Sequence, residues 1–383
     1  MNVHIIQPLI PLYRVPLFTM LASCDDLHVK VSASLTHPGV EEGLSSEKRG
    51  LAYEDLDHPC ITFGGDRFMW QRGLQLDADM GPGDVLVISG NLRFLSNIPL
   101  IWKARRRGVG IVWWGHGFSR RRSRFWDAIR RVFLHFADVI LLYTDKEVRE
   151  YRRSGFPGEK LFATNNSIDQ ASVREATAAW SKTRLEEFRK REDLIGKQIL
   201  LFCGRRTNSV SLGLVFSAVA RLRKTHGELL YVIIGPDDEN QALKAQAAEL
   251  GIEGCIRWLG PIYDQHALAP WYLSATCFVF PGSIGLSLIH SFSYGLPVIV
   301  PDCWHFPEIA AFRDGGNGLF YREGDVGDLA ERISSVIRDP AYRQRLSAEA
   351  LRSVERDYNM DNMVQRFREA IYAAAGCRGE GPL

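Results

Sequence analysis

The sequence predicts an α/β protein built from two doubly wound parallel sheets. Short apolar strands alternate with helical stretches through both halves of the chain, and this alternation is typical of parallel strands joined by right-handed crossovers. A polar, charged segment near the middle of the chain separates the two series of strands. The chain of 383 residues is also long for one hydrophobic core, because domains commonly hold roughly 100 to 200 residues.

The first series of strands predicts a doubly wound domain over residues 1–170. Helical stretches such as Asn91–Arg107 separate its strands. The expected strands are short and apolar, and they are Val3–Gln7, His28–Ser34, Val85–Ser89, Gly110–Trp114, Val139–Tyr143 and Leu161–Thr164. The polar, charged stretch 171–195 follows them, and we expect it to be a largely helical connector.

The second series predicts another doubly wound domain over residues 196–358. Its expected strands are Gln198–Cys203, Tyr231–Gly235, Cys255–Leu259, Cys277–Phe280, Pro297–Val300 and Gly318–Tyr321. The last segment, 359–383, contains an expected helix over Asn359–Ala375 with apolar residues along one face. This helix should therefore pack against another part of the chain.

The composition is that of an ordinary globular protein, with 46% hydrophobic and 24% charged residues and a net charge of +2. No apolar run approaches the roughly 20 residues that a membrane-spanning helix needs. Met1–Pro8 lacks the basic start and the cleavage site of a signal peptide, and we expect it to form a buried strand. Seven cysteines without a Cys-x-x-Cys pair indicate reduced thiols in the cytoplasm.

A basic amphipathic helix is expected over residues 120–136. Between its arginines, apolar residues recur at three- and four-residue spacing, namely Phe125, Trp126, Ile129, Val132, Phe133 and Phe136. An ordinary surface helix accounts for this pattern. So does peripheral contact with the anionic inner face of the cell membrane, where each basic side chain contributes on the order of 1 kcal/mol. No helix-turn-helix, RNA-binding or zinc-finger signature accompanies the helix, so nucleic acid is not an expected partner.

The segment 281–301 carries the clearest sign of a ligand site. After an apolar strand, the Pro281-Gly282-Ser283 turn leads into a helix, and Gly285 lets the backbone approach a ligand closely. Free N–H groups at the start of this helix favour an anion, above all a diphosphate. His290 lies seven residues beyond Ser283, close to two helical turns, so both side chains could face one ligand.

This segment resembles the signature of the retaining, nucleotide-sugar-dependent glycosyltransferases of family 4, which have the GT-B fold. Ser283-Ile284-Gly285-Leu286 matches the Gly-Phe-Gly-Leu of that signature, and Tyr294-Gly295-Leu296-Pro297 matches its exit. Gly282 and His290 stand where the family has two glutamates. The resemblance implies that N–H groups around Ile284 and Gly285 hold the donor diphosphate. It also implies that His290 holds the ribose, since imidazole both donates and accepts hydrogen bonds.

Other parts of the second domain extend the resemblance. Leu200–Arg205 matches the family's strand-Gly-Arg, whose arginine clamps the diphosphate, and the guanidinium of Arg205 suits that role because it can hold phosphate oxygens in a bidentate fork. Pro236 and Leu259 fit the loops that embrace the nucleotide base. The family's phosphate-binding lysine aligns with Val210, and three nearby side chains could compensate for it: Arg206, Ser209 and Ser211.

In the first domain, His116 within the Trp113–Gly117 segment resembles the histidine that reaches the donor sugar, and it is the candidate catalytic residue. Tyr13 and Arg14 lie in the first strand-to-helix loop, which in the family overhangs the acceptor. The resemblance thus implies two Rossmann-like domains that face an interdomain cleft, with the last helix crossing back to the first domain.

The implied activity is transfer of a sugar from a nucleotide diphosphate sugar, foremost a UDP- or GDP-sugar, to a hydroxyl acceptor with retention of anomeric configuration. The basic helix and the habit of the family favour a glycan or lipid-linked glycan of cell-surface polysaccharide or lipopolysaccharide as the acceptor. No cofactor is expected. No Asp-x-Asp pair follows a strand, and Asp237-Asp238 fits a solvated turn better, so the transfer should be independent of metal.

Other classes of protein account for only part of the pattern. The sequence has no Gly-x-x-x-x-Gly-Lys loop for ATP, and Pro8–Pro16 contains no glycine for a dinucleotide fingerprint, which argues against an NAD-dependent dehydrogenase. A nucleotide-sugar 2-epimerase has the same fold but would carry carboxylates around the sugar. A non-catalytic nucleotide-sugar-binding protein would account for Gly282, Val210 and His290 together.

Overall fold

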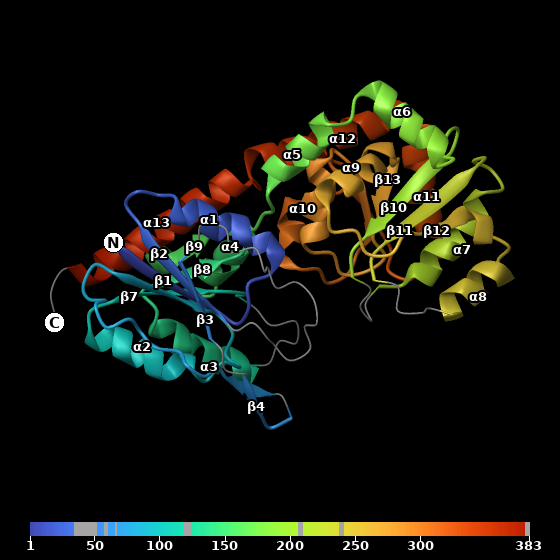
Figure 1. Cartoon of the computed structure of the whole chain (residues 1–383). Helices are drawn as coiled ribbons and strands as arrows, with labels where there is room; N and C mark the ends of the chain where they lie inside the picture. Colours follow the sequence, from blue (N-terminus) through green and yellow to red (C-terminus); the bar gives the residue numbers. More distant parts are fainter. Residues whose placement is uncertain are drawn as a thin grey trace. The chain divides into compact units, whose positions relative to one another are not determined.

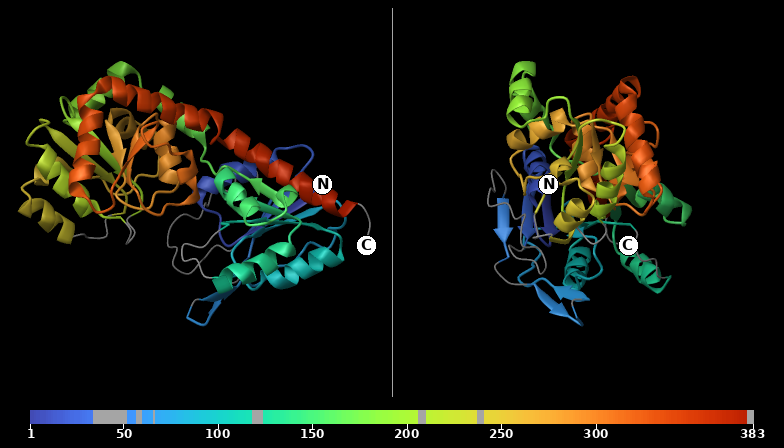
Figure 2. Two further views of the ribbon diagram at one scale, coloured as in Figure 1. Left: turned by 180° about the vertical axis from the view of Figure 1, so that it is seen from behind. Right: turned by 90° about the vertical axis from the view of Figure 1, so that its right-hand side faces the viewer.

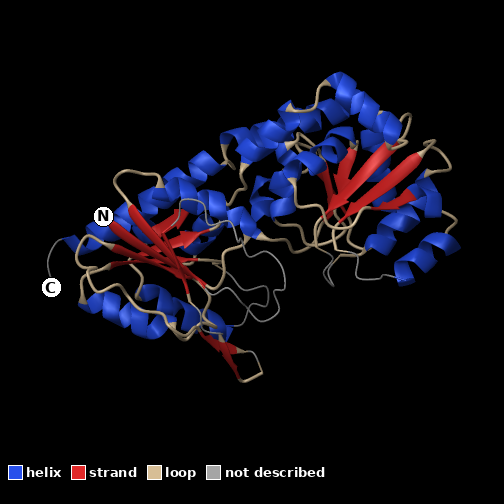
Figure 3. Ribbon diagram, in the orientation of Figure 1, coloured by secondary structure: helices blue, strands red, loops and turns tan. Residues whose placement is uncertain are grey.

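The computed structural model describes residues 1–33, 52–56, 60–65, 67–117, 124–205, 210–236 and 241–379. The chain forms two compact units (Figure 1). Unit 1 comprises Met1–Ile168 together with Met360–Leu383, and unit 2 comprises Asp169–Asn359. Each unit is built on a parallel sheet with helices on both faces (Figure 3), which confirms the predicted fold class.

Unit 1 contains a seven-stranded sheet with the strand order β3-β2-β1-β6-β7-β8-β9, and every adjacent pair is parallel. The six expected strands are all present. The seventh, β3, was not expected, because its short Ala-Tyr-Glu-Asp sequence lacks the apolar content of the others. The strands are β1 (Asn2–Gln7), β2 (His28–Ala33), β3 (Ala52–Asp55), β6 (Val85–Ser89), β7 (Gly110–Trp114), β8 (Val139–Leu142) and β9 (Leu161–Ala163), and β4 (Ile61–Phe63) and β5 (Phe68–Trp70) form a separate antiparallel hairpin.

Two apolar clusters pack on the two faces of this sheet, because successive side chains of a strand point to opposite sides. Val85 and Val87 of β6 belong to the cluster that includes α1 and α13, whereas Leu86 and Ile88 belong to the cluster that includes residues of α2, α3 and α4. The helices of unit 1 are η1 (Leu12–Arg14), α1 (Val15–Ala22), α2 (Asn97–Arg106), α3 (Arg124–His135), α4 (Asp145–Arg153), η2 (Gly158–Lys160) and α13 (Met360–Gly379).

The last helix, α13, belongs to unit 1 although unit 2 precedes it in the chain. It packs on α1 and β7 through Met363, Phe367 and Ile371, and it lies along unit 1 in the view from behind (Figure 2). Gly110 lies so close to the carbonyl of Ala374 that a Cβ atom at position 110 would overlap it. The return of the last helix to the first domain therefore agrees with the expected fold.

Unit 2 contains a six-stranded parallel sheet with the order β12-β11-β10-β13-β14-β15. All six expected strands are present, and most of their residues are buried because helices cover both faces. The strands are β10 (Gln198–Cys203), β11 (Leu229–Ile234), β12 (Ile256–Trp258), β13 (Cys277–Val279), β14 (Val298–Pro301) and β15 (Gly318–Tyr321).

The stretch 171–195, expected as a connector, forms α5 and α6, which pack on α9 and so belong to unit 2. The helices of unit 2 are α5 (Gln170–Ala178), α6 (Lys182–Arg191), α7 (Leu212–Leu222), α8 (Gln241–Glu249), η3 (Glu253–Cys255), α9 (Gln265–Ser274), α10 (Leu286–Ser293), η4 (Pro307–Ala311), α11 (Val326–Arg338) and α12 (Pro340–Arg356). Across the residues that the structure describes, no helix combines the length and the apolar character that crossing a membrane would require.

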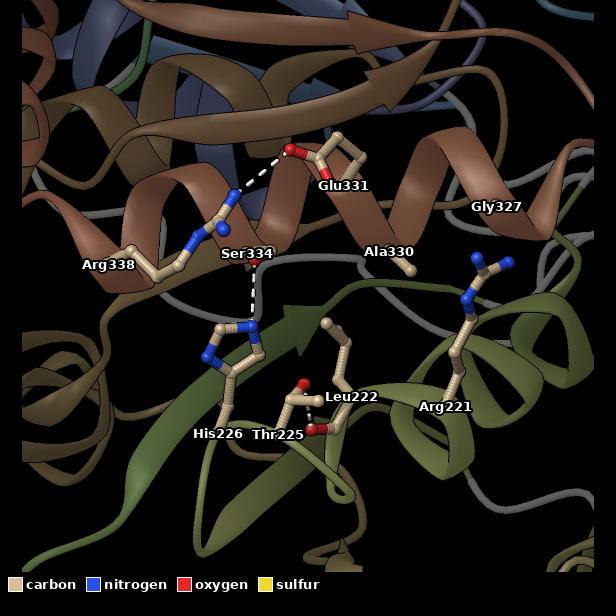
Figure 4. A pocket seen from close by; sticks show the side chains of 9 residues that line it. All are labelled: Arg221, Leu222, Thr225, His226, Gly327, Ala330, Glu331, Ser334 and Arg338. Carbon is tan, nitrogen blue, oxygen red and sulfur yellow. Dashed lines mark hydrogen bonds and ion pairs between the residues drawn. The ribbon is translucent and has the colours of Figure 1, made fainter.

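A hollow of about 400 Å³ lies between α7 and α11. Arg221 points from the end of α7 toward Gly327, and His226 hydrogen-bonds to Ser334 of α11 with Nε2 and Oγ 2.8 Å apart (Figure 4). Because α7 begins after β10 and runs back along the sheet, this hollow lies at the end of α7 that is remote from Gly204. It is therefore separate from the loops that follow the strands.

Candidate functional site

The loop between β13 and α10 forms the centre of the candidate donor site in unit 2. Ile284 is fully buried and anchors this loop, and Gly285 stands at the N-cap of α10. The N–H groups of Leu286 and Ser287, in the first turn, have no acceptor within the helix, and the positive end of the helix dipole lies there. This helix start can therefore bind an anion.

His305, in the loop after β14, fixes the conformation of this segment. The Ile284 N–H donates to Nδ1 of His305 over 3.1 Å, and Nε2 of the same ring bonds the Pro301 carbonyl over 2.8 Å. The carbonyl can only accept, so Nε2 carries the proton and Nδ1 is the acceptor. The Ser283 hydroxyl also donates to the Trp304 carbonyl over 2.7 Å. The Ile284 N–H is thus engaged by His305 in this structure. Binding of the diphosphate by the N–H groups around Ile284 and Gly285 stays a prediction.

The loops after β10 and β11 meet beside this segment. A Cβ atom at Gly235 would overlap the carbonyl of Gly204, so only glycine allows these two loops to pass. Arg205 follows Gly204 and is exposed, while Pro236 and Leu259 are half-buried at the ends of neighbouring strands. Since the carboxyl ends of parallel strands meet at one edge of a sheet, the structure brings Arg205, Pro236, Leu259 and the start of α10 to the same edge.

Ser211, one of the three residues considered as substitutes for the missing lysine, is the N-cap residue of α7 near the same loop. Its N–H donates to the Pro281 carbonyl over 2.8 Å, so this N–H is not available to phosphate. Val210 is half-buried beside it. Arg206 and Ser209 lie outside the described residues, as do Asp237 and Asp238.

His290 is enclosed by other side chains of unit 2. Its Nε2 lies 3.0 Å from the amide nitrogen of Gln265, and its Nδ1 lies 3.3 Å from the Tyr272 hydroxyl. The ring also packs against Tyr272 and Tyr294, with centroid distances of 4.8 and 5.7 Å. Burial lowers the pKa of His290 to about 4, so the ring is neutral near pH 7. Binding of the ribose by His290 stays a prediction, and it requires the ring to exchange one of these partners.

The loop after β7 in unit 1 carries the predicted catalytic residue. His116 is exposed, its ring lies 4.5 Å from that of Tyr143, and Nη1 of Arg130 donates to its carbonyl over 2.9 Å. Desolvation lowers the pKa of His116 to about 4 although part of the residue is exposed, and the charges of Arg14 and Arg130 act in the same direction. A neutral imidazole at this position can donate or accept a hydrogen bond with a sugar hydroxyl.

Tyr13 and Arg14 form the 3-10 turn η1 after β1, and they point in different directions. Tyr13 is exposed, as expected for a loop residue. Arg14 is only 8% exposed, and its guanidinium carbon lies 4.3 Å from the ring centroid of Trp114 and 5.4 Å from that of Tyr143. Arg14 thus joins His116 in one cluster at the carboxyl edge of the first sheet.

Comparison with known families decides the assignment of unit 2. Residues 184–353 match the family of glycosyl transferases group 1. These residues belong to that family. The group 1 domain contains the residues from Arg205 to His290 that are predicted to bind the nucleotide diphosphate, whereas His116 and Arg14 lie outside the matched residues.

Known proteins resemble this chain in sequence. A D-inositol 3-phosphate glycosyltransferase of Frankia alni is 31% identical over 201 residues, which are 48% of this chain and 46% of that protein. A phosphatidyl-myo-inositol mannosyltransferase of Mycobacterium leprae is 28% identical over 167 residues, which are 42% of this chain and 43% of that protein. The chain therefore spans about half the length of the relatives that it matches.

Solved structures resemble the whole chain, including the group 1 domain. A glycosyltransferase of Rickettsia africae has a TM-score of 0.73 at 11% identity and covers 98% of both chains. Anabaena HepE in complex with UDP has a TM-score of 0.70 at 12% identity and covers 96% of this chain and 98% of its own. The lipopolysaccharide outer core galactosyltransferase WaaB has a TM-score of 0.65 at 15% identity, covering 97% and 99%. The chain thus has the GT-B fold.

Three residues of the group 1 domain that sequence reasoning missed are His305, Gln265 and Tyr272. Their contacts with Ile284 and His290 join segments 18 to 25 residues apart in the chain, so no short sequence pattern predicts these contacts. Among the residues that the structure describes, no group of three or more histidine, cysteine, aspartate or glutamate side chains could hold a metal ion.

Proposed function

We propose that this protein is a retaining glycosyltransferase that moves a sugar from a nucleotide diphosphate sugar to a hydroxyl acceptor. The observation that carries the proposal is the open start of α10 at the carboxyl edge of the sheet, inside a domain of the group 1 family. Three places at this edge could contact a nucleotide. They are Arg205 after β10, Pro236 and Leu259 after β11 and β12, and the start of α10.

The donor is a UDP- or GDP-sugar, and UDP is favoured because the similar HepE was solved with UDP and with UDP-glucose. Arg205 and the first turn of α10 would hold the diphosphate, with Gly282, Ser283, Gly285 and Leu286 forming the loop around it. The side chains of these residues leave no carboxylate to repel the phosphates. Transfer would then depend on stabilisation of the leaving diphosphate by a fixed positive charge and the helix dipole, without a metal ion.

His116 is the proposed contact to the donor sugar, and His290 the proposed contact to the ribose. Near pH 7 both rings are neutral, because the pKa of each is lowered to about 4. A neutral ring can accept a hydrogen bond from a sugar hydroxyl with one nitrogen and keep a protein partner with the other. These two roles therefore need no change of protonation during turnover.

The proposed acceptor is a glycan or lipid-linked glycan of cell-surface polysaccharide or lipopolysaccharide. The similarity to WaaB, a lipopolysaccharide galactosyltransferase, and to a phosphatidyl-myo-inositol mannosyltransferase supports this class. The proposed location is the cytoplasm, with peripheral contact at the inner face of the cell membrane.

The membrane contact is proposed for the exposed side of α3 and the residues after it. Val132 is 59% exposed and Phe136 is 46% exposed, while Leu134 between them is buried in the unit. Arg131 is exposed on the same helix. Apolar and cationic side chains that share one exposed surface suit an anionic bilayer. The side chains of Phe125 and Trp126, which belonged to the sequence pattern, lie outside the described residues.

A release assay tests the proposed function. Free nucleotide diphosphate is measured after incubation with UDP-, GDP- and dTDP-sugars, with and without a membrane extract, and with and without EDTA. We expect release from one class of donor that requires the extract and persists in EDTA, and a product that retains the anomeric configuration. Binding without turnover for every donor would instead indicate a non-catalytic protein. Interconversion of the sugar without an acceptor would indicate a 2-epimerase.

A further inference from the structure

The cluster around Arg14 in unit 1 contains buried hydrogen-bond donors without an acceptor among the described residues. Its members are the buried Arg14, the rings of Trp114 and Tyr143 on which the guanidinium lies, and His116 and Arg130 at the end of β7. Within the part of the chain that the structure describes, three buried donor atoms of this cluster have no hydrogen-bond partner: Nη1 of Arg14, Nε1 of Trp114 and Nε of Arg130. Burying a charged donor without an acceptor is costly, so the concentration of three such atoms in one cluster calls for an explanation.

The ring beneath Arg14 is held rigidly by the core. Trp114 packs edge-on against Phe18 of α1 and Phe367 of α13, with centroid distances of 6.2 and 4.9 Å. The guanidinium therefore rests on a fixed aromatic surface, and stacking of this kind leaves its N–H edge available for a ligand.

The nearby carboxylates at the start of α4 are engaged elsewhere. Glu147 accepts hydrogen bonds from the N–H groups of Gly117, Tyr143 and Thr144. Asp145 pairs with Arg366 of α13 over 2.9 Å and accepts from Asn165. In the part of the chain that the structure describes, no ion pair joins Arg14 to either carboxylate. The positive charge of Arg14 is thus not compensated by these two groups.

We infer that this cluster binds a phosphate group carried by the acceptor. The inference rests on the proposed function, because it names the class of acceptor, but the binding itself does not depend on transfer. A phosphate ester supplies several acceptor oxygens, which matches three donor atoms from two arginines and a tryptophan, and guanidinium groups bind it in charge-assisted pairs. The ester could come from a soluble sugar phosphate or from a lipid phosphate.

Binding of two probes tests the inference with UDP present at saturation, so that the donor site is occupied. The soluble probe is glucose 1-phosphate, compared with glucose. The lipid probe is a vesicle containing phosphatidic acid, compared with one of phosphatidylcholine alone. The first is measured by calorimetry and the second by sedimentation, and the arm that shows binding identifies the source of the phosphate.

Arg14→Met removes the charge and keeps an apolar side chain over Trp114. Arg106→Met is the matched control, because Arg106 also lies over a tryptophan, 4.2 Å from the Trp102 ring centroid, but is exposed on α2. We expect at least one phosphate probe to bind the wild type and the control equally, and to bind Arg14→Met about tenfold or more weakly. Equal binding by Arg14→Met, or no binding of either probe to the wild type, overturns the inference.

Thermal unfolding without ligand separates a binding role from a structural one. Removing a buried charge that lacks a partner should leave the Tm of Arg14→Met equal to or above that of the wild type. A clear fall in Tm would show that Arg14 serves the core, and would overturn the inference. Arg14-dependent phosphate binding in a protein that transfers no sugar would reject the proposed function and keep the phosphate site. Sugar transfer without Arg14-dependent phosphate binding would support the proposed function and reject the phosphate site.

Discussion

Arg205 is an exposed cation at the same sheet edge as the start of α10, and its contribution can be isolated by one substitution. Arg205→Ala should remove a charge-assisted contact to the diphosphate and weaken UDP binding by roughly 1.5 to 3 kcal/mol, which is about 10- to 150-fold in Kd. Calorimetric titration with UDP measures the change. Arg221→Ala is the control, since Arg221 is also exposed but borders the hollow between α7 and α11 (Figure 4). UDP affinity that survives in Arg205→Ala would refute the diphosphate role.

His290 predicts a pH dependence of stability. In the unfolded chain an imidazole takes up its proton near pH 6.5, whereas the folded protein protonates His290 only near pH 4 because the ring is buried. The unfolded state therefore binds more protons between these values, and stability should fall as the pH drops from about 6.5 to about 4. The contribution of this one residue is up to about 1.4 kcal/mol per pH unit.

Urea unfolding of the wild type and of His290→Gln between about pH 7 and pH 5 measures this contribution. The variant has no group that titrates at this position, so its stability should depend less steeply on pH. Equal slopes for the two proteins would mean that the environment of His290 does not depress its pKa.

At the scale of elements, the loop before α10 depends on one imidazole from another loop. His305→Ala removes the acceptor of the buried Ile284 N–H, which costs about 1 to 3 kcal/mol when the group is left unsatisfied. We expect weaker UDP binding, because the start of α10 is no longer fixed. His305→Asn can restore one acceptor and should recover part of the affinity. If both variants bind UDP as the wild type does, the loop holds its conformation without His305.

The strands and the donor-side loops could be predicted from sequence, because apolar runs mark buried strands and a parallel sheet brings its carboxyl ends to one edge. The strand β3 could not, because two of its four residues are acidic and only pairing with β2 makes the segment a strand. The inward turn of Arg14 was also missed. It depends on Trp114 and Tyr143, which lie far from Arg14 in the chain, and no local pattern reports such a contact.

At the scale of the whole molecule, α13 completes the core of unit 1. Gly110→Ala would place a methyl group against the Ala374 carbonyl, and we expect it to lower the free energy of unfolding by about 1 to 3 kcal/mol, as overpacking does. Gly376→Ala, in α13 itself, is the control, because nothing lies within 4 Å of the added Cβ atom. Thermal unfolding compares the two variants. Equal Tm values for Gly110→Ala and Gly376→Ala would show that α13 can shift away from β7 at little cost.

The position of α13 also sets the order in which the protein can fold during synthesis. Domains generally fold as units as they leave the ribosome, the N-terminal one first. Here the sheet of unit 1 emerges before unit 2, yet the face on which α1 and α13 both pack stays partly uncovered until residues 360–379 have been made. Unit 2 is translated in that interval and can fold completely. Unit 1 therefore starts to fold before unit 2 but completes its core after it. A ribosome that stalls within unit 2 leaves apolar residues of unit 1 exposed.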